Sequence, residues 1–242
     1  MSFKDLTENV ICKFKAATAW RSSDLTGVYI KNSFLFREVG KKSIMQVRNY
    51  DTKTRKGQWS NWIEIEKLDE RFSNVCLVRA VQLLIAKVEA LSSKPMSTIK
   101  DPTTSEEVQD TPLFITSSTQ RSPLRDGTIR NKFASYFMAN ISVGDEKSLA
   151  SEFSAHSSRN AVASAAADMG VPTSRIAALA LCSIDNLQST YITTVQREYE
   201  FPPAACLDSQ QNVSTKLLLP WVHYTTSKDE GTCLCSSISD IN

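Results

Sequence analysis

Apolar residues recur along much of the chain at the spacing of amphipathic helices. In the first part the positions that carry this pattern are Leu6, Val10, Phe14, Ala17, Leu25 and Val28. Side chains three or four positions apart lie on one face of a helix, so the pattern predicts a helix over residues 5–32. The same spacing predicts helices over 76–91, 125–141 and 155–169, the last of them rich in alanine.

The end of the alanine-rich helix carries a clear stop signal. Gly170 is typical of a helix C-terminus, because glycine adopts the left-handed backbone conformation at little cost. Pro172 or Thr173 then begins a second helix. A third helix is expected to begin near Asp185 and to run through Tyr191.

The pattern changes between these helices. Residues 44–47 and 62–65 are short and rich in β-branched or aromatic side chains, while 48–59 between them are polar and basic. They predict a β-hairpin with a long basic tip. Residues 92–112 are rich in Ser, Thr, Pro and acids and predict a flexible loop inside the domain, and 113–116 predict a short buried segment.

These elements predict a mainly α fold with a small antiparallel β-hairpin, an α+β class. Residues 1–200 form one domain in this interpretation, because nothing before the loop could complete a core of its own. Residues 201–224 form a C-terminal extension, and the small polar residues 225–242 form a loose tail.

Composition excludes several classes of protein. With 41% hydrophobic and 22% charged residues, the chain is typical of a globular protein and not of a disordered one. The 28 basic and 26 acidic residues give a net charge of +2, which does not by itself indicate a nucleic-acid binder. Basic side chains nevertheless crowd one stretch: Lys41, Lys42, Arg48, Lys53, Arg55 and Lys56.

Cysteine and histidine usage predicts neither a metal nor a cofactor. Of the six cysteines only Cys233 and Cys235 are close in sequence, and a C-x-C pair alone is not a zinc site. No apolar run reaches the ~18 residues that span a bilayer, and the N-terminus does not resemble a secretory signal. We therefore expect a reduced intracellular protein without a membrane partner.

One short motif points to chemistry. His156 and Arg159 lie three positions apart and would share one helix face. Two donors held side by side suit an anion, above all a phosphate. The motif precedes the alanine-rich helix and Gly170, and the segments Leu179–Ser183 and Ser189–Tyr191 follow.

This order of landmarks resembles the catalytic domain of the tyrosine recombinase, or phage integrase, family. An earlier segment, 19–28, is similar to the family's first catalytic arginine motif, with Arg21 as the arginine and Asp24 in place of Glu. A basic hairpin turn should carry the family's lysine, which is Lys53 or, as the alternative, Lys56. The long Ser-rich loop and the alanine-rich helix are most similar to recombinases of eukaryotic mobile elements such as DIRS-type retrotransposons and Cryptons.

The resemblance implies site-specific cleavage and rejoining of double-stranded DNA through a 3′-phosphotyrosine on Tyr191. Arg21 and Arg159 would then hold the non-bridging phosphate oxygens, and Lys53 would protonate the leaving 5′ oxygen. His156 would accept or relay the proton of the tyrosine. These steps need neither a metal nor ATP.

The family also forms synaptic tetramers on DNA, usually by donating a C-terminal segment, for which 201–224 is the candidate. In a eukaryotic host the protein would act in the nucleus.

Two departures from the family pattern leave an alternative open. Cys182 stands where the family usually has His or Trp, and a thiol is a weak donor. The chain also begins close to Arg21, so we expect a catalytic domain without the family's separate N-terminal DNA clamp. The alternative is a catalytically decayed or domesticated domain that binds DNA or a protein, and a helical interaction protein without DNA affinity is a third hypothesis.

Overall fold

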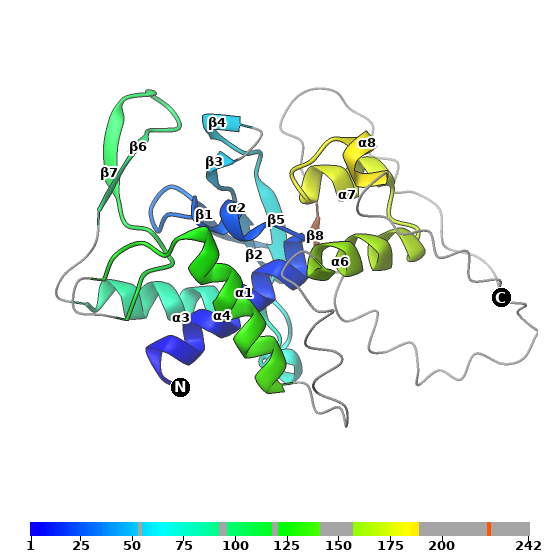
Figure 1. The fold of residues 1–242 in the computed structure, drawn as a ribbon, viewed down its shortest axis with the longest axis horizontal. Coiled ribbons are helices and arrows are strands. Elements are labelled where there is room, and N and C mark those ends of the chain that lie inside the picture. The colour runs from blue at the N-terminus through cyan, green and yellow to red at the C-terminus, as the bar shows by residue number, and fades with distance from the viewer. Residues whose placement is uncertain (53–54, 92–95, 118–120, 141–156, 189–221, 224–242) are drawn as a thin grey trace, which may run out of the picture.

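The computed structural model describes residues 1–52, 55–91, 96–117, 121–140, 157–188 and 222–223 of the chain (Figure 1). The helices are α1 Phe3–Thr18, α2 Ser22–Leu25, α3 Leu77–Glu89, α4 Asp126–Asn140, α6 Ser157–Asp168, α7 Thr173–Leu179 and α8 Ile184–Asn186, with a 3₁₀ turn at Glu70–Phe72. The strands are β1 Phe34–Val39, β2 Lys42–Val47, β3 Tyr50–Thr52, β4 Arg55–Trp59, β5 Ile63–Glu66, β6 Ser97–Lys100, β7 Glu107–Asp110 and β8 Val222–His223. Helices combined with small antiparallel sheets confirm the coarse α+β expectation.

The helix expected over 5–32 is interrupted, and this correction matters for the site. Helix α1 ends at Thr18, and Ala19 turns the chain with a left-handed φ of 54°. Phe14 and Trp20 are both fully buried, and their rings stack 5.8 Å apart. Residues six positions apart on a continuous helix point about 120° apart around its axis, so the turn at Ala19 is what lets the two rings stack in one core.

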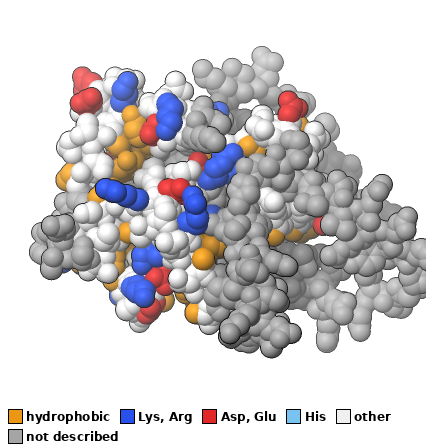
Figure 2. Space-filling view, viewed as in Figure 1, with side chains coloured by type: hydrophobic (Ala, Val, Ile, Leu, Met, Phe, Trp, Pro, Cys, Tyr) orange, Lys and Arg blue, Asp and Glu red, His pale blue; other side chains and the backbone are white. Residues whose placement is uncertain are grey.

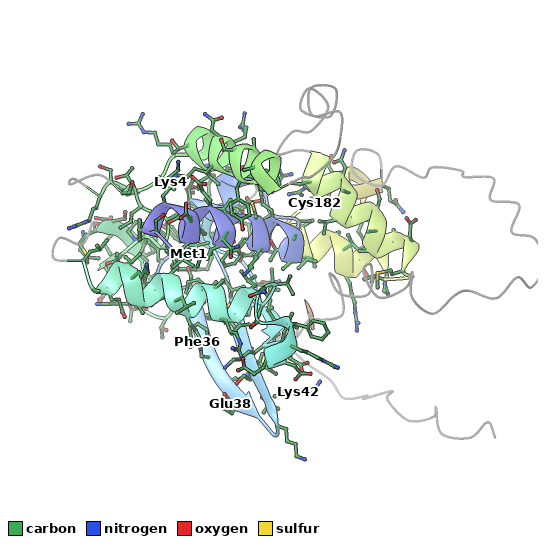
Figure 3. The ribbon with its side chains drawn as sticks, turned by 90° about the horizontal axis from the view of Figure 1, so that it is seen from below. Met1, Lys4, Phe36, Glu38, Lys42 and Cys182 are labelled. Atoms are coloured by element: carbon green, nitrogen blue, oxygen red, sulfur yellow. The ribbon has the colours of Figure 1, made fainter. Side chains whose placement is uncertain are left out.

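The main sheet has the order β1-β2-β5-β8, and its neighbouring strands are antiparallel. The expected hairpin pairing is confirmed, since Met45 faces Ile65 and Val47 faces Ile63. The sequence did not predict strand β1, because its residues Phe34–Val39 do not alternate between apolar and polar. In the structure only Phe34 of this strand is buried. Its partner β2 holds it in place, and the tip of this pair projects away from the helices (Figure 3).

The basic tip between β2 and β5 is itself a hairpin and not a simple loop. Strands β3 and β4 pair Tyr50 with Trp59 and Thr52 with Arg55. At its base the guanidinium of Arg48 lies 4.5 Å from the ring centre of Trp59 and 4.1 Å from that of Trp62. Cations over aromatic faces are attracted to them, so this stack fixes the root of the β3–β4 hairpin.

The segment expected as a flexible loop, 92–112, contains a second hairpin. Strands β6 and β7 pair over four residues each, and Ile99 is almost fully buried. The Asp110 carboxylate accepts hydrogen bonds from the backbone N–H groups of Lys31 and Asn32. The indole of Trp59 also donates to the carbonyl of Lys100 at 2.9 Å, so the two hairpins contact each other. Those long-range bonds order a segment whose polar composition gave no sign of strands.

Helices α3, α4, α6 and α7 lie close to their expected residues, and α8 begins near Asp185 as expected. The part of that last expected helix from residue 189 to Tyr191 lies outside the described residues. Helix α1 lies between α3 and α4, and together they cover the largest apolar cluster (Figure 3). The segment 113–116 is buried at Leu113–Ile115, as expected. Helices α6 and α7 form a smaller alanine-rich cluster, and Gly170 between them has the left-handed φ of 77° that its stop signal predicted.

Little of the C-terminal extension 201–224 belongs to the described residues. Val222 and His223 form β8, which pairs with Ile65 and Glu64 of β5. Residues 225–242 lie outside the described part. Across the described residues, no helix combines the length and the apolar character that crossing a membrane requires.

Candidate functional site

Arg159 joins the two turns that carry other candidate residues. It lies in the first turn of α6, and only 1% of its surface is exposed. Its Nη1 donates to the carbonyl of Ala19 at 3.2 Å, and its Nη2 donates to the carbonyl of Ala180 at 2.6 Å. Ala19 is two residues before Arg21, and Ala180 is two residues before Cys182. Three segments far apart in sequence therefore meet at one guanidinium.

Arg21 is the residue just before the short helix α2 and is half-buried. Its backbone N–H donates to Oδ2 of Asp24 at 2.8 Å. The same carboxylate oxygen lies 3.9 Å from Nη1 of Arg159. Burial raises the pKa of Asp24, while the bond from Arg21 and the charges of Arg21 and Arg159 oppose that rise. Asp24 thus links the two candidate arginines.

Two further contacts hold the same turn. The indole of Trp20 donates to the carbonyl of Leu179 at 3.0 Å. The ammonium of Lys15 donates to the carbonyl of Trp20 at 3.3 Å and is buried. Burial, reinforced by the charge of Arg159, lowers the pKa of Lys15 to about 8. Fully buried cations are rare in proteins, so Lys15, Asp24 and Arg159 form an ionic cluster of unusual cost.

Cys182 follows α7 in a tight turn. Leu181 has a left-handed φ of 52°, and the Cys182 N–H donates to the carbonyl of Ala177 at 3.0 Å. The half-buried thiol lines a cavity of about 280 Å³ between this turn and the β3–β4 hairpin. The described residues that line the cavity are Arg55, Asn61, Ile63, Ala177, Ala178, Leu181, Cys182 and Ser183.

Of the other candidates, Lys56 belongs to the described residues and three lie outside them. Lys56 lies on β4, where its side chain is 74% exposed and its Nζ is 3.8 Å from a carboxylate oxygen of Asp51. Lys53, His156 and Tyr191 lie outside the described residues. The structure therefore brings the segments of Arg21, Arg159 and Cys182 together and leaves the places of the lysine, histidine and tyrosine as predictions.

Sequence reasoning missed the roles of two described residues at this site. Lys15 occupies an ordinary position in an amphipathic helix, and nothing in its neighbourhood distinguishes it from a surface lysine. Arg55 belongs to the basic run that the sequence shows, but only the tertiary structure brings it to the same cavity as Cys182.

The surface around these elements is mixed in charge. Figure 2 shows Lys and Arg side chains interspersed with acidic ones over the β6–β7 and β3–β4 hairpins and α2. Among the described residues, no three His, Cys, Asp or Glu side chains gather where they could hold a metal ion.

Comparison with protein-family models gives no match, and comparison with curated proteins gives none either. The resemblance to tyrosine recombinases therefore rests on the motif residues in the sequence alone.

Proposed function

We propose that this chain is a tyrosine recombinase-like catalytic domain that cleaves and rejoins double-stranded DNA. The observation that carries the proposal is the pair of bonds from Arg159 to Ala19 and Ala180. A family motif read from sequence alone requires three distant segments to converge. These bonds join the segments of Arg21, Arg159 and Cys182 at one point.

In the proposed reaction, the phenolic oxygen of Tyr191 attacks the scissile phosphorus and forms a 3′-phosphotyrosine ester. The bond from phosphorus to the 5′ oxygen breaks, and Lys53 gives that oxygen a proton. His156 takes the proton of the tyrosine, since a phenol with a pKa near ~10 is a poor nucleophile unaided. A 5′ hydroxyl of another strand then attacks the phosphotyrosine, which restores the phosphodiester and frees Tyr191.

The two arginines would stabilise the negative charge that develops on the phosphate. Each Nη of an arginine carries two N–H groups. In the proposed reaction Arg159 would direct such an N–H group to a phosphate oxygen. Asp24 supports this arrangement, because it bonds to the backbone of Arg21 and lies 3.9 Å from Arg159.

A second candidate function is DNA binding without cleavage. It is favoured by the weakly donating Cys182 at a position where the family has a strong donor, and by the deep burial of Arg159. In this case Arg159 would be a structural residue only.

Covalent trapping separates the two functions. The probe is a pool of labelled duplexes that have a randomised centre and a nick close to it. Cleavage beside the nick releases a short fragment, and because this fragment diffuses away, the reaction cannot reverse and the protein stays joined to the DNA. We expect a denaturation-resistant protein–DNA adduct with the unaltered chain and none with Tyr191→Phe. Tyr136→Phe is the matched control, because the Tyr136 hydroxyl contacts Asn9 on the α1–α4 side of the fold. If the unaltered chain shifts DNA in a gel but yields no adduct, the cleavage proposal is refuted and DNA binding remains.

Self-association is part of the same proposal. We propose that copies assemble on DNA as tetramers and that 201–224 joins them. In support, residues 222–223 of this segment already pair with β5 of their own chain, so the segment has the extended form that adds to a sheet. Light scattering with and without duplex DNA tests it, and a chain that stays monomeric on DNA contradicts it.

A further inference from the structure

The cavity between the β3–β4 hairpin and the turn after α7 has the chemistry of an anion site. Arg55 and Asn61 line it from the hairpin side, and Cys182 and Ser183 line it from the turn. The other described lining residues are apolar, and none of them is acidic. A phosphate entering this cavity would meet donors and no repelling carboxylate.

Arg55 is held in place but keeps its charge available. Its backbone N–H donates to Oγ1 of Thr52 at 3.1 Å, and its Nη1 donates to Oδ1 of Asn61 at 3.2 Å. None of the ion pairs among the described residues involves Arg55. The Asn61 contact orients the guanidinium without neutralising it, so the other N–H groups can reach a ligand.

The opposite wall has uncharged donors only. Cys182 offers a thiol, which donates poorly. The Ser183 oxygen accepts from the backbone N–H of Asn186 at 3.3 Å, which leaves its own hydrogen to donate. A phosphate bound beside Cys182 would therefore depend on the hairpin side of the cavity for its charge.

We propose that this cavity holds the scissile DNA phosphate and that Arg55 supplies the donor that Cys182 cannot. The proximity of Cys182 to Ala180, whose carbonyl binds Arg159, puts the cavity next to the convergence of the candidate arginines. The inference rests on the proposed function and extends it, because Arg55 becomes a catalytic residue outside the motif positions. Losing one such donor slows an acyl- or phosphoryl-type transfer by about 10²-fold.

The first test measures the rate of adduct formation on the nicked duplex pool. Arg55→Ala should slow adduct formation by about 10²-fold, and Arg55→Lys should slow it less, because a charge remains. Adding Cys182→His to Arg55→Ala should restore at least about tenfold of the lost rate, since histidine is a better donor than a thiol. Arg71→Ala is the control, because Arg71 is 75% exposed and lies in the 3₁₀ turn before α3.

The second test does not require cleavage. Iodoacetamide alkylation of Cys182 is followed by mass spectrometry in the Tyr191→Phe chain, with and without random-sequence duplex DNA. DNA should slow the alkylation of Cys182 in this chain and in its Arg71→Ala derivative, but not in its Arg55→Ala derivative. Cys12, on α1, should react equally with and without DNA.

The outcomes separate this inference from the proposed function. Normal adduct formation by Arg55→Ala, with no DNA protection of Cys182, overturns the role of Arg55 and leaves the recombinase proposal standing. Arg55-dependent protection without any adduct refutes cleavage and supports a phosphate site that only binds. If no adduct forms and DNA does not protect Cys182, both proposals are overturned. If Cys182→His fails to restore the adduct rate of Arg55→Ala, Arg55 does not replace the donor that Cys182 lacks.

Discussion

Replacing Arg159 with methionine tests whether this residue holds the segments of Ala19 and Ala180 together. The change keeps the length of the side chain but removes its charge and its bonds to Ala19 and Ala180. At 3.9 Å and an effective dielectric of about 20, the attraction between Arg159 and Asp24 is about 4 kcal/mol. Each carbonyl left without its donor adds about 1–3 kcal/mol, while protonation of Asp24 recovers part of the loss.

We therefore expect Arg159→Met to lower the free energy of unfolding by about 4 kcal/mol, in the range found when one partner of a buried ion pair is removed. A domain is stable by about 5–15 kcal/mol in total, so the variant should be close to unfolding. Urea denaturation followed by tryptophan fluorescence measures this loss, since Trp20 is fully buried at the same turn.

Arg130→Met is the matched control, because Arg130 forms an exposed ion pair with Asp126 one turn away on α4. Such pairs contribute about 0.3–0.5 kcal/mol, so this variant should remain close to the unaltered chain. A double-mutant cycle adds Asp24→Asn to Arg159→Met, and the combined loss should be smaller than the sum of the single losses. If Arg159→Met lowers the free energy of unfolding by less than about 1 kcal/mol, or by no more than Arg130→Met does, Arg159 does not hold these segments together.

Two further measurements probe the turn and the hairpin. Lys15 has a pKa of about 8 in the fold against 10.5 when exposed, so between these values the unfolded chain binds more protons and stability rises with pH. The unfolding free energy of the unaltered chain minus that of Lys15→Met should therefore increase as pH rises from 8 to 10.5. A difference that stays constant with pH in urea titrations contradicts the burial of Lys15. At Gly27 an added methyl would lie 1.9 Å from the Tyr50 carbonyl oxygen, so Gly27→Ala should cost more than about 2 kcal/mol. Gly127→Ala, in open space on α4, should raise the free energy of unfolding by about 0.5 kcal/mol. Equal melting temperatures for the two variants would refute the close approach at Gly27.

Local periodicity was sufficient for the elements that obey one pattern along their whole length. Helix α3 has a continuous apolar face, α4 carries buried Ile129 and Phe133 one turn apart, α6 is rich in alanine, and the stop at Gly170 needs only a left-handed residue. The pairing of β2 with β5 also follows from two β-rich runs joined by a polar segment. Each of these features depends on residues that are close in sequence.

The motif residues gave part of the candidate site in the same way. Arg21, Arg159 and Cys182 were chosen from sequence, and their segments do converge. Their burial and partners could not be read from the sequence, because neither Lys15 nor Asp24 shows in its own neighbourhood that it will be buried. The positions of Lys53, His156 and Tyr191 are still predictions.

The sequence by itself thus determined most of the helices and the main strand pairing, and it supplied the candidate residues for a phosphate site. Only the tertiary structure decided the break at Ala19, the β6–β7 hairpin and the cavity shared by Arg55 and Cys182. The physical reason is that a helix face is set by neighbours three and four positions away. A broken helix, an ordered polar hairpin and a buried guanidinium are stabilised by partners far along the chain.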